Sequence, residues 1–306
     1  MNFLYVLEGI RTPFLNKLMG LVTNLGGETL FIAAAIIIFW CLDKKCGYYM
    51  LTVGFCGVII SQFLKLWYRI PRPWVVDPDF TIVESARAEA TGYSFPSGHT
   101  QTVFATLGAP ARYTKKLWLR IVLIVFLLIV PFSRMYVGVH TPLDVGVAFA
   151  TGLVLVFVLY PIFEHMDEKP LPVYIMFFAF ILLSAAFVLF VEFYEFPINL
   201  DMQNYVEGEK NAYMILAASV ALLITYHVDR KYLKIDTRAV WWAQIIKLAV
   251  GAGIALAIKS GLKEPLMSLF NGSPVSHSVR YFLLIIFCGI IWPMTFRFFG
   301  KLGKKA

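Results

Sequence analysis

Two consecutive stretches, WLRIVLIVFLLIVPF at residues 118–132 and SRMYVGVHTPLD at residues 133–144, decide the fold. The first holds a single charged residue, and a further stretch, VGVAFATGLVLVFVLYPIF at residues 145–163, holds none. Apolar segments of about 20 residues are typical of helices that cross a bilayer. Gly138 permits a turn between the two apolar segments. The sequence therefore predicts two membrane-spanning helices joined by a short turn at residues 134–139.

The composition extends this prediction to an all-α, polytopic transmembrane bundle. Of the 306 residues, 59% are hydrophobic and 15% are charged, whereas soluble domains carry roughly 25% charged residues. Residues 3–25 mix Arg11 and Lys17 with apolar residues, which predicts an amphipathic helix on the membrane surface. We expect about nine spans, at residues 27–42, 47–66, 98–112, 117–133, 140–163, 172–195, 210–228, 239–260 and 280–299.

The distribution of lysine and arginine predicts the orientation. The connections after the first, third and seventh spans contain DKK, RYTKKLWLR and HVDRKYLKIDTR, and the chain ends in GKLGKKA. Short loops rich in Lys and Arg face the cytoplasm. The loop at residues 67–97 and the turn at residues 134–139 are therefore expected to face outward. The net charge of +8 then reflects topology, and we expect no nucleic-acid partner because no soluble basic domain is present.

Three motifs lie on the expected outward side, and the first is KLWYRIPRP at residues 65–73. Pro71 and Pro73 stop a helix, which places Lys65 and Arg72 near the outer surface. Snorkelling of the two cations at the membrane boundary would explain them equally well.

The second motif is PSGHT at residues 96–100. Ser97 suits the N-cap of a helix, and Gly98 would let a ligand approach the backbone N–H groups of the first turn. A capped helix alone would explain Ser97, but it gives no reason for His99.

The third motif places His140 four residues before Asp144, so both side chains can share a helix face. The carboxylate can accept the imidazole N–H and fix its tautomer. A purely structural hydrogen bond is the alternative. Together with Arg134, the motifs bring several cations to one side of the bilayer, where they avoid the cost of about 2.5–3.5 kcal/mol for each cation at its centre. Such a cluster suits a phosphate, because guanidinium groups match its oxygens.

The three motifs together resemble the signature motifs of the type 2 phosphatidic acid phosphatase (PAP2) superfamily. They read Lys65-x6-Arg72-Pro73, Pro96-Ser97-Gly98-His99 and Ser133-Arg134-x5-His140-x3-Asp144, in matching order and spacing. Vanadium haloperoxidases share these motifs but are typically soluble, so nine spans favour the phosphatase branch. The resemblance covers a catalytic membrane core at residues 27–163, between the interfacial segment at 1–26 and additional transmembrane helices at 164–306.

The resemblance implies a role for each motif residue. His140 would attack phosphorus and form a phosphohistidine, and Asp144 would orient it. His99 would protonate the leaving group and then activate water. The phosphate would be bound by Lys65, Arg72, Ser97, Gly98 and Arg134. The outward side shows no Asp, Glu and His cluster with metal-ligand spacing, so we expect no metal and no other cofactor.

We therefore expect an integral-membrane hydrolase that removes phosphate from a lipid phosphate or diphosphate on the extracytoplasmic side of a bacterial plasma membrane. Phosphatidate, phosphatidylglycerophosphate, undecaprenyl diphosphate and sphingoid phosphates all stay open as substrates. One alternative is a phosphatase for a soluble ester, because glucose-6-phosphatases have a similar nine-span layout. Another is a phosphate-binding transporter or flippase. The additional helices could form a substrate groove or a homodimer contact.

Two further charged residues need an explanation. Glu28 could line the mouth of the site or cap a helix, and we expect the cap. Lys247 lies well inside a span, where an ionisable residue is a functional candidate. We expect Lys247 to snorkel towards the cytoplasmic interface, away from the site.

Overall fold

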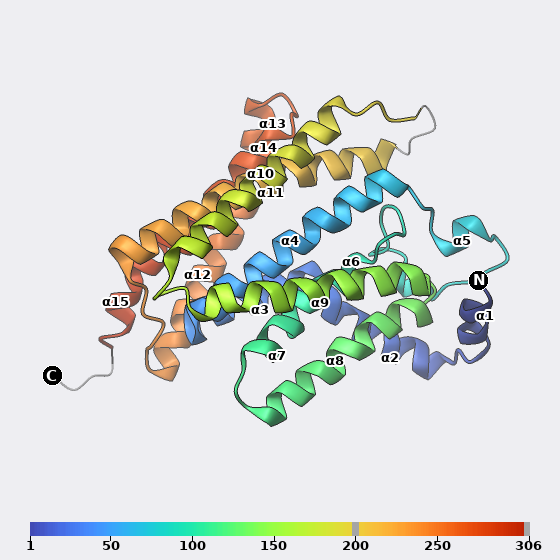
Figure 1. Cartoon of the computed structure of the whole chain (residues 1–306), viewed down its shortest axis with the longest axis horizontal. Helices are drawn as coiled ribbons and strands as arrows, with labels where there is room; N and C mark the ends of the chain where they lie inside the picture. Colours follow the sequence, from blue (N-terminus) through green and yellow to red (C-terminus); the bar gives the residue numbers. More distant parts are fainter. Residues whose placement is uncertain (198–201, 303–306) are drawn as a thin grey trace. The chain divides into compact units, whose positions relative to one another are not determined.

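The computed structural model describes residues 1–197 and 202–302 and contains only helices within them. Lys304 and Lys305 of the basic tail lie outside the described residues. The chain forms two compact units (Figure 1). The first comprises Met1–Ala35, Tyr49–Pro161 and Pro197–Gly208, and the second comprises Ile36–Tyr48, Ile162–Phe196 and Glu209–Ala306. The domain boundaries expected at residues 26 and 163 stay predictions.

Within the described residues, seven helices are long and apolar enough to cross a membrane, which confirms the polytopic all-α class. They are Lys44–Val76, Leu117–Tyr136 (α8), Pro142–Glu164 (α9), Pro170–Phe193 (α10), Met202–Leu233, Trp241–Leu269 and Val275–Phe299. Within the longer ones lie α4 (Lys44–Tyr68), α5 (Pro73–Val76), α11 (Met202–Val228), α12 (Trp241–Gly261), α13 (Lys263–Leu269), α14 (Val275–Ile286) and α15 (Phe296–Phe299).

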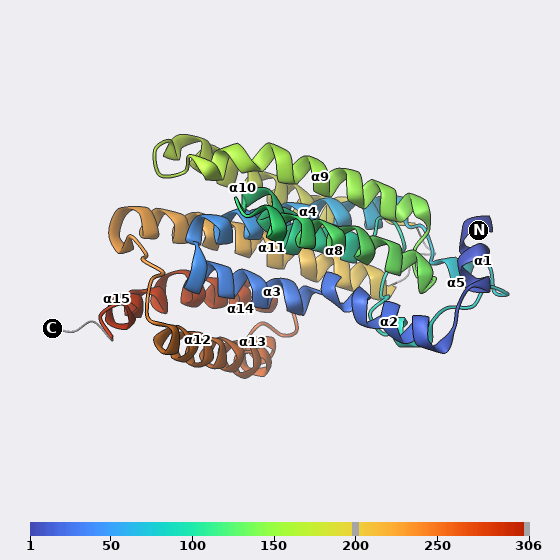
Figure 2. The same cartoon turned by 90° about the horizontal axis from the view of Figure 1, so that it is seen from below.

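Two of the nine expected spans do not pass this test. Residues 27–42 form part of a bent pair, Pro13–Gly26 and Glu28–Leu42, whose axes differ by 52° (Figure 2). The pair would count as an eighth span. Residues 98–112 are divided into α6 (Gly98–Val103), a π-helical segment (Phe104–Gly108) and α7 (Ala109–Tyr113). The backbone stays right-handed α at both junctions, so residues 98–113 form one helix that is shorter than the length of about 20 residues typical of a span.

The N-terminal segment is two helices, α1 (Asn2–Gly9) and α2 (Pro13–Thr23), so the single helix expected at residues 3–25 is wrong. Thr12 and Pro13 explain the break, because the Thr12 side chain caps a new helix that begins with proline. Arg11 lies in the break and donates from Nε to the Tyr136 carbonyl at 3.0 Å. The segment therefore packs on the protein, and its place on the membrane surface stays a prediction.

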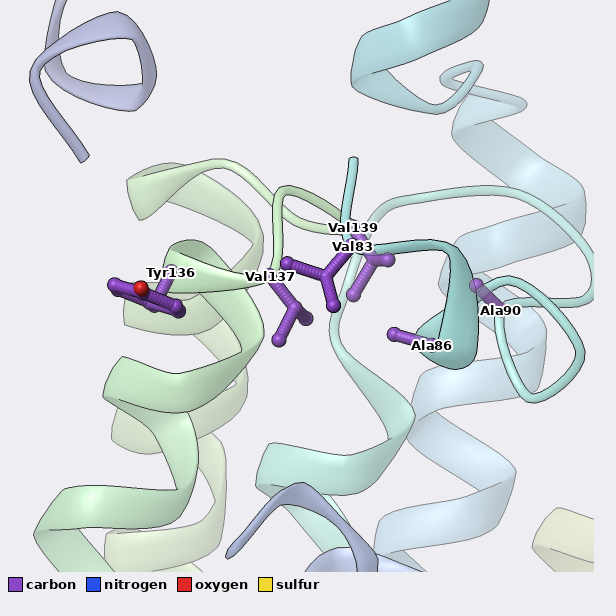
Figure 3. Close-up of a cluster of buried hydrophobic side chains, with 6 residues drawn as sticks. All are labelled: Val83, Ala86, Ala90, Tyr136, Val137 and Val139. Carbon is purple, nitrogen blue, oxygen red and sulfur yellow. The ribbon is translucent and has the colours of Figure 1, made fainter. Parts of the chain in front are cut away.

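A small hydrophobic cluster joins the loop at residues 77–97 to the turn between α8 and α9 (Figure 3). Its members are Val83, Ala86, Ala90, Tyr136, Val137 and Val139. The backbone N–H of Val83 also donates to the Val137 carbonyl at 3.0 Å. The loop that precedes His99 is thereby held against the turn that carries His140.

The second unit contains Lys247, which is 1% exposed. Its ammonium group donates to the carbonyls of Trp40 at 2.8 Å and Thr237 at 3.0 Å, and lies 4.3 Å from the centre of the Phe296 ring. Thr237 belongs to the connection that is expected to face the cytoplasm, so the direction expected for the side chain is kept. The expected contact with water is wrong, because carbonyls and an aromatic face inside the protein take its place.

We predict that Gly138→Ala destabilises the protein. Gly138 has φ of +86°, and an added Cβ would lie 2.8 Å from Arg11 Nη2 and 3.0 Å from the Phe80 ring. The loss should be about 1–3 kcal/mol, seen as a lower melting temperature in detergent. Gly146→Ala in α9 is the control, because its Cβ meets nothing within 4 Å. Equal melting temperatures for the two variants would contradict the prediction.

Candidate active site

A cavity of about 220 Å³ in the first unit brings the three motifs together. Six of the eight predicted site residues line it: Lys65, Arg72, Gly98, His99, Arg134 and His140. Asp144 and Ser97 are not among its lining residues. Lys65 comes from the last turn of α4, Arg72 from the N-cap of α5 and Arg134 from the last turn of α8. Helix ends therefore supply the cations.

His140 is held between a carboxylate and a guanidinium. It is 1% exposed, and its Nδ1 lies 3.5 Å from Asp144 Oδ2. The same carboxylate oxygen accepts from Ser94 Oγ at 2.6 Å and from the Thr141 N–H at 2.7 Å. With the proton on Nδ1 towards Asp144, Nε2 carries the lone pair. Arg72 Nη1 lies 2.9 Å from that Nε2.

Backbone carbonyls hold the two cations of the first motif. Arg72 is 6% exposed and donates to the carbonyls of Thr91 at 2.6 Å, Gly92 at 3.0 Å and Val139 at 3.0 Å. Lys65 donates to the Tyr93 carbonyl. Carbonyls accept these hydrogen bonds without neutralising the charge, so both cations keep a net attraction for an anion.

Arg134 is the clearest sign of an anionic ligand. Its side chain is 0% exposed, and its Nη1 donates to Thr23 Oγ1 at 2.7 Å. Its Nε and Nη2 have no hydrogen-bond partner in the described part of the chain. Leaving buried donors unpaired costs about 1–3 kcal/mol each, and more for a charged group. These N–H groups fit the oxygens of a phosphate in the cavity.

Ser97 caps α6 as expected, since its Oγ accepts from the Thr100 N–H at 3.4 Å and from Thr100 Oγ1 at 3.0 Å. It is 0% exposed, and its contact with phosphate stays a prediction. Gly98 lines the cavity, and an added Cβ there would meet nothing within 4 Å. The backbone at Gly98 is therefore open to a ligand.

His99 has a partner that sequence reasoning missed. Its Nε2 lies 3.0 Å from Glu89 Oε2, and Glu89 sits in an irregular loop with no pattern to mark it. His99 and His140 both lie outside the seven candidate spans. Burial and the positive charge of Arg134 lower the pKa of His99 to about 4, although the hydrogen bond to Glu89 opposes this effect. Burial and Arg72 lower the pKa of His140 well below its usual value, so both rings are neutral at neutral pH.

Three of the other residues that line the cavity come from α3 and α11. Glu28 lies there, at the start of α3 (Glu28–Ile37), although a helix cap was expected. Asn204 and Glu207 belong to the beginning of α11, 60 or more residues after the third motif. No local pattern links this helix to the motifs, so only the tertiary structure could place it at the site.

A second, larger cavity of about 640 Å³ adjoins the first, because Glu28, Glu89 and His99 line both. Its remaining lining residues belong to the short segment before α3 and to α3 itself: Asn24, Leu25, Gly27, Thr29, Leu30 and Ala33. His99 therefore lies at the junction of the two cavities, and Leu25, Leu30 and Ala33 provide apolar surface in the second one.

Comparison with known proteins agrees with this geometry. The PAP2 superfamily model matches residues 45–167, and a model described as "PAP2 superfamily phosphatase, transmembrane extension" matches residues 213–305, beyond the part covered by the resemblance in the motifs. Phosphatidylglycerophosphatase B of Bacillus subtilis is 30% identical over 52% of this chain and 79% of its own. Undecaprenyl-diphosphatase of Sulfolobus acidocaldarius is 29% identical over 45% of this chain and 66% of its own.

Among solved structures, that of Aquifex aeolicus LpxE is similar at 21% identity and a TM-score of 0.46, over 52% of this chain and 93% of its own. Seven apolar helices together with the transmembrane extension indicate an integral membrane protein. The motifs, their convergence on one cavity and both family matches lead to one conclusion: the chain belongs to the PAP2 superfamily.

Proposed function

We propose that the protein is a lipid phosphatase that works through a phosphohistidine on the extracytoplasmic side of the membrane. One observation carries the proposal: the buried Arg134, two of whose N–H groups have no partner in the described residues, lines the same cavity as His140. In the described residues, none of Lys65, Arg72 and Arg134 forms an ion pair with a carboxylate. Three cations without an ion-pair contact around a neutral imidazole suit phosphoryl transfer.

In the first step, His140 Nε2 attacks phosphorus as the bond from phosphorus to the leaving oxygen breaks. In the structure, Arg72 Nη1 faces His140 Nε2. When substrate binds, a phosphate oxygen accepts the hydrogen bond from Arg72 Nη1 instead, so the lone pair on Nε2 is free to attack. Asp144 stabilises the positive charge that develops on the imidazole. The fixed cations stabilise the charge on the equatorial oxygens.

His99 provides the proton for the leaving oxygen. Its low pKa applies to the site without an anion, and a bound phosphate dianion raises it by offsetting the charges of Arg134 and Arg72. Glu89 holds Nε2 and stabilises the imidazolium, which leaves Nδ1 to transfer the proton. In the second step the neutral His99 takes a proton from water, which attacks the phosphohistidine and releases inorganic phosphate.

The adjoining cavity along α3 supports a lipid substrate. Its apolar residues can cover a hydrocarbon chain while the phosphate lies among the cations. The similar proteins from Bacillus subtilis and Sulfolobus acidocaldarius are named for lipid phosphates. The excess of Lys and Arg in the connections opposite the site supports the outward orientation.

His140→Ala should abolish turnover, because it removes the imidazole that we assign as the nucleophile, whereas His99, the other imidazole in the cavity, is assigned to proton transfer. We expect phosphate release from a long-chain alkyl phosphate in detergent micelles to fall by about 10⁴-fold or more. His165→Ala, at an exposed histidine outside the cavity, is the control. Near-normal release by a folded His140→Ala protein would exclude the nucleophile assignment.

His99→Ala should reduce kcat/KM for alkyl phosphates by about 10²–10⁴-fold and for nitrophenyl phosphate much less, because nitrophenolate leaves without a proton. kcat/KM reports the steps up to the phosphoenzyme, so the second step does not mask the difference. Glu89→Gln should also reduce kcat/KM more for alkyl phosphates than for nitrophenyl phosphate. The loss should be smaller, and kcat/KM for alkyl phosphates should stay at about one-tenth of the wild-type value or above. Equal losses for both substrates would contradict the general-acid role.

Activity should not depend on a divalent cation, since Lys65, Arg72 and Arg134 supply the positive charge. We expect phosphate release by the purified protein to stay within about twofold after treatment with EDTA. A strong loss that magnesium restores would overturn metal independence.

A further inference from the structure

Charge changes sign between the floor and the mouth of the catalytic cavity. At the floor, Arg134, Arg72 and His140 are 0%, 6% and 1% exposed. The carboxylates that line the same cavity are more accessible: Glu28 is exposed, Glu207 is partly buried and the Glu89 side chain is 49% exposed. If the phosphate group binds at the floor, the part of the substrate that is attached to it lies beside these carboxylates.

Two of these carboxylates are not occupied by protein groups. Glu89 pairs with His99, whereas Glu28 and Glu207 have no hydrogen bond or ion pair within the residues that the structure describes. They come from distant parts of the chain, the start of α3 and the second turn of α11. Their free acceptor oxygens lie on the same cavity as the unpaired N–H groups of Arg134.

This arrangement distinguishes between classes of lipid phosphate. A second phosphate next to the reacting one would lie against the carboxylates and be repelled by them. A protonated amine on a carbon close to the phosphate ester would instead be attracted, and could donate to their oxygens. A neutral chain would gain nothing from either carboxylate.

We propose that Glu28 and Glu207 form an acidic mouth that selects phosphate monoesters bearing an ammonium group close to the phosphate, and that disfavours diphosphates. The inference rests on the proposed lipid phosphatase function and names its substrate class. Among the lipids left open above, long-chain amino alcohol phosphates fit this mouth, and polyprenyl diphosphates do not.

The test compares two matched pairs of substrates with purified protein in detergent micelles. The first pair is sphinganine 1-phosphate and its N-acetyl derivative, which differ in the positive charge. The second pair is the monophosphate and the diphosphate of one isoprenol. We expect kcat/KM to favour the free amine over the amide, and the monophosphate over the diphosphate, by about fivefold or more in each pair.

Substitutions then assign the preference to the mouth. Glu207→Gln should reduce the ratio within each pair by about threefold, and Glu28→Gln combined with Glu207→Gln should bring both ratios close to one. Glu209→Gln is the matched control, because it removes the same charge two residues along α11 without lining the cavity. It should leave both ratios at the wild-type values. The N-acetyl substrate serves as an internal reference for correctly folded enzyme.

The outcomes separate the two proposals. If none of the four substrates is hydrolysed, the proposed lipid phosphatase function fails. If substrates are hydrolysed but the ratios are near one, or if the double variant lowers kcat/KM for all substrates equally, the acidic mouth is overturned and the phosphatase function stands. The acidic mouth is also overturned if Glu209→Gln reduces the two kcat/KM ratios as much as Glu207→Gln does.

Discussion

Buried positive charge without a carboxylate partner is the constraint on which the site depends. Three cations meet around His140, and each is held by a neutral group of the protein. Carbonyls of the 91–93 segment and of Val139 hold Lys65 and Arg72, and a hydroxyl holds Arg134. These neutral partners hold the three cationic side chains in position without cancelling their positive charge, so the charge can attract an anion. A carboxylate in direct contact with one of the three cations would weaken the attraction of that cation for phosphate.

The scaffold of the first unit serves this arrangement. Carbonyls can accept from the cations only if the 77–97 loop is held against the turn between α8 and α9, and the cluster around Val83 and Val137 does so. The N-terminal helices add a second support through Leu4, Leu7, Phe80 and Ile82. His99 lies in the first turn of α6, directly after the Ser97 N-cap, so its side chain lies near a helix N-terminus that borders the cavity.

A comparison of two buried cations separates structure from function. Lys247 and Arg134 are both almost fully buried. The ammonium of Lys247 is satisfied by two carbonyls and the Phe296 ring, whereas two N–H groups of Arg134 have no partner in the described residues. Burial of a charge within a membrane protein is therefore not enough to indicate a site. The unsatisfied hydrogen-bonding capacity of Arg134 is what points to a ligand.

The sequence by itself determined the features that depend on short spacing: the apolar segments, the helix that Ser97 caps, and the four-residue separation of His140 from Asp144. These are local, because helix periodicity and capping act over a few residues. The sequence predicted about nine spans, whereas seven described helices, or eight with the bent pair, are long and apolar enough to cross a membrane. Hydropathy does not register the π-helical segment within residues 98–113 or the bend before α3. Only the tertiary structure decided that Glu89, Glu28 and Glu207 share a cavity with the motifs. Loop closure and helix packing bring these residues together from distant positions, and no periodic pattern along the chain encodes such contacts.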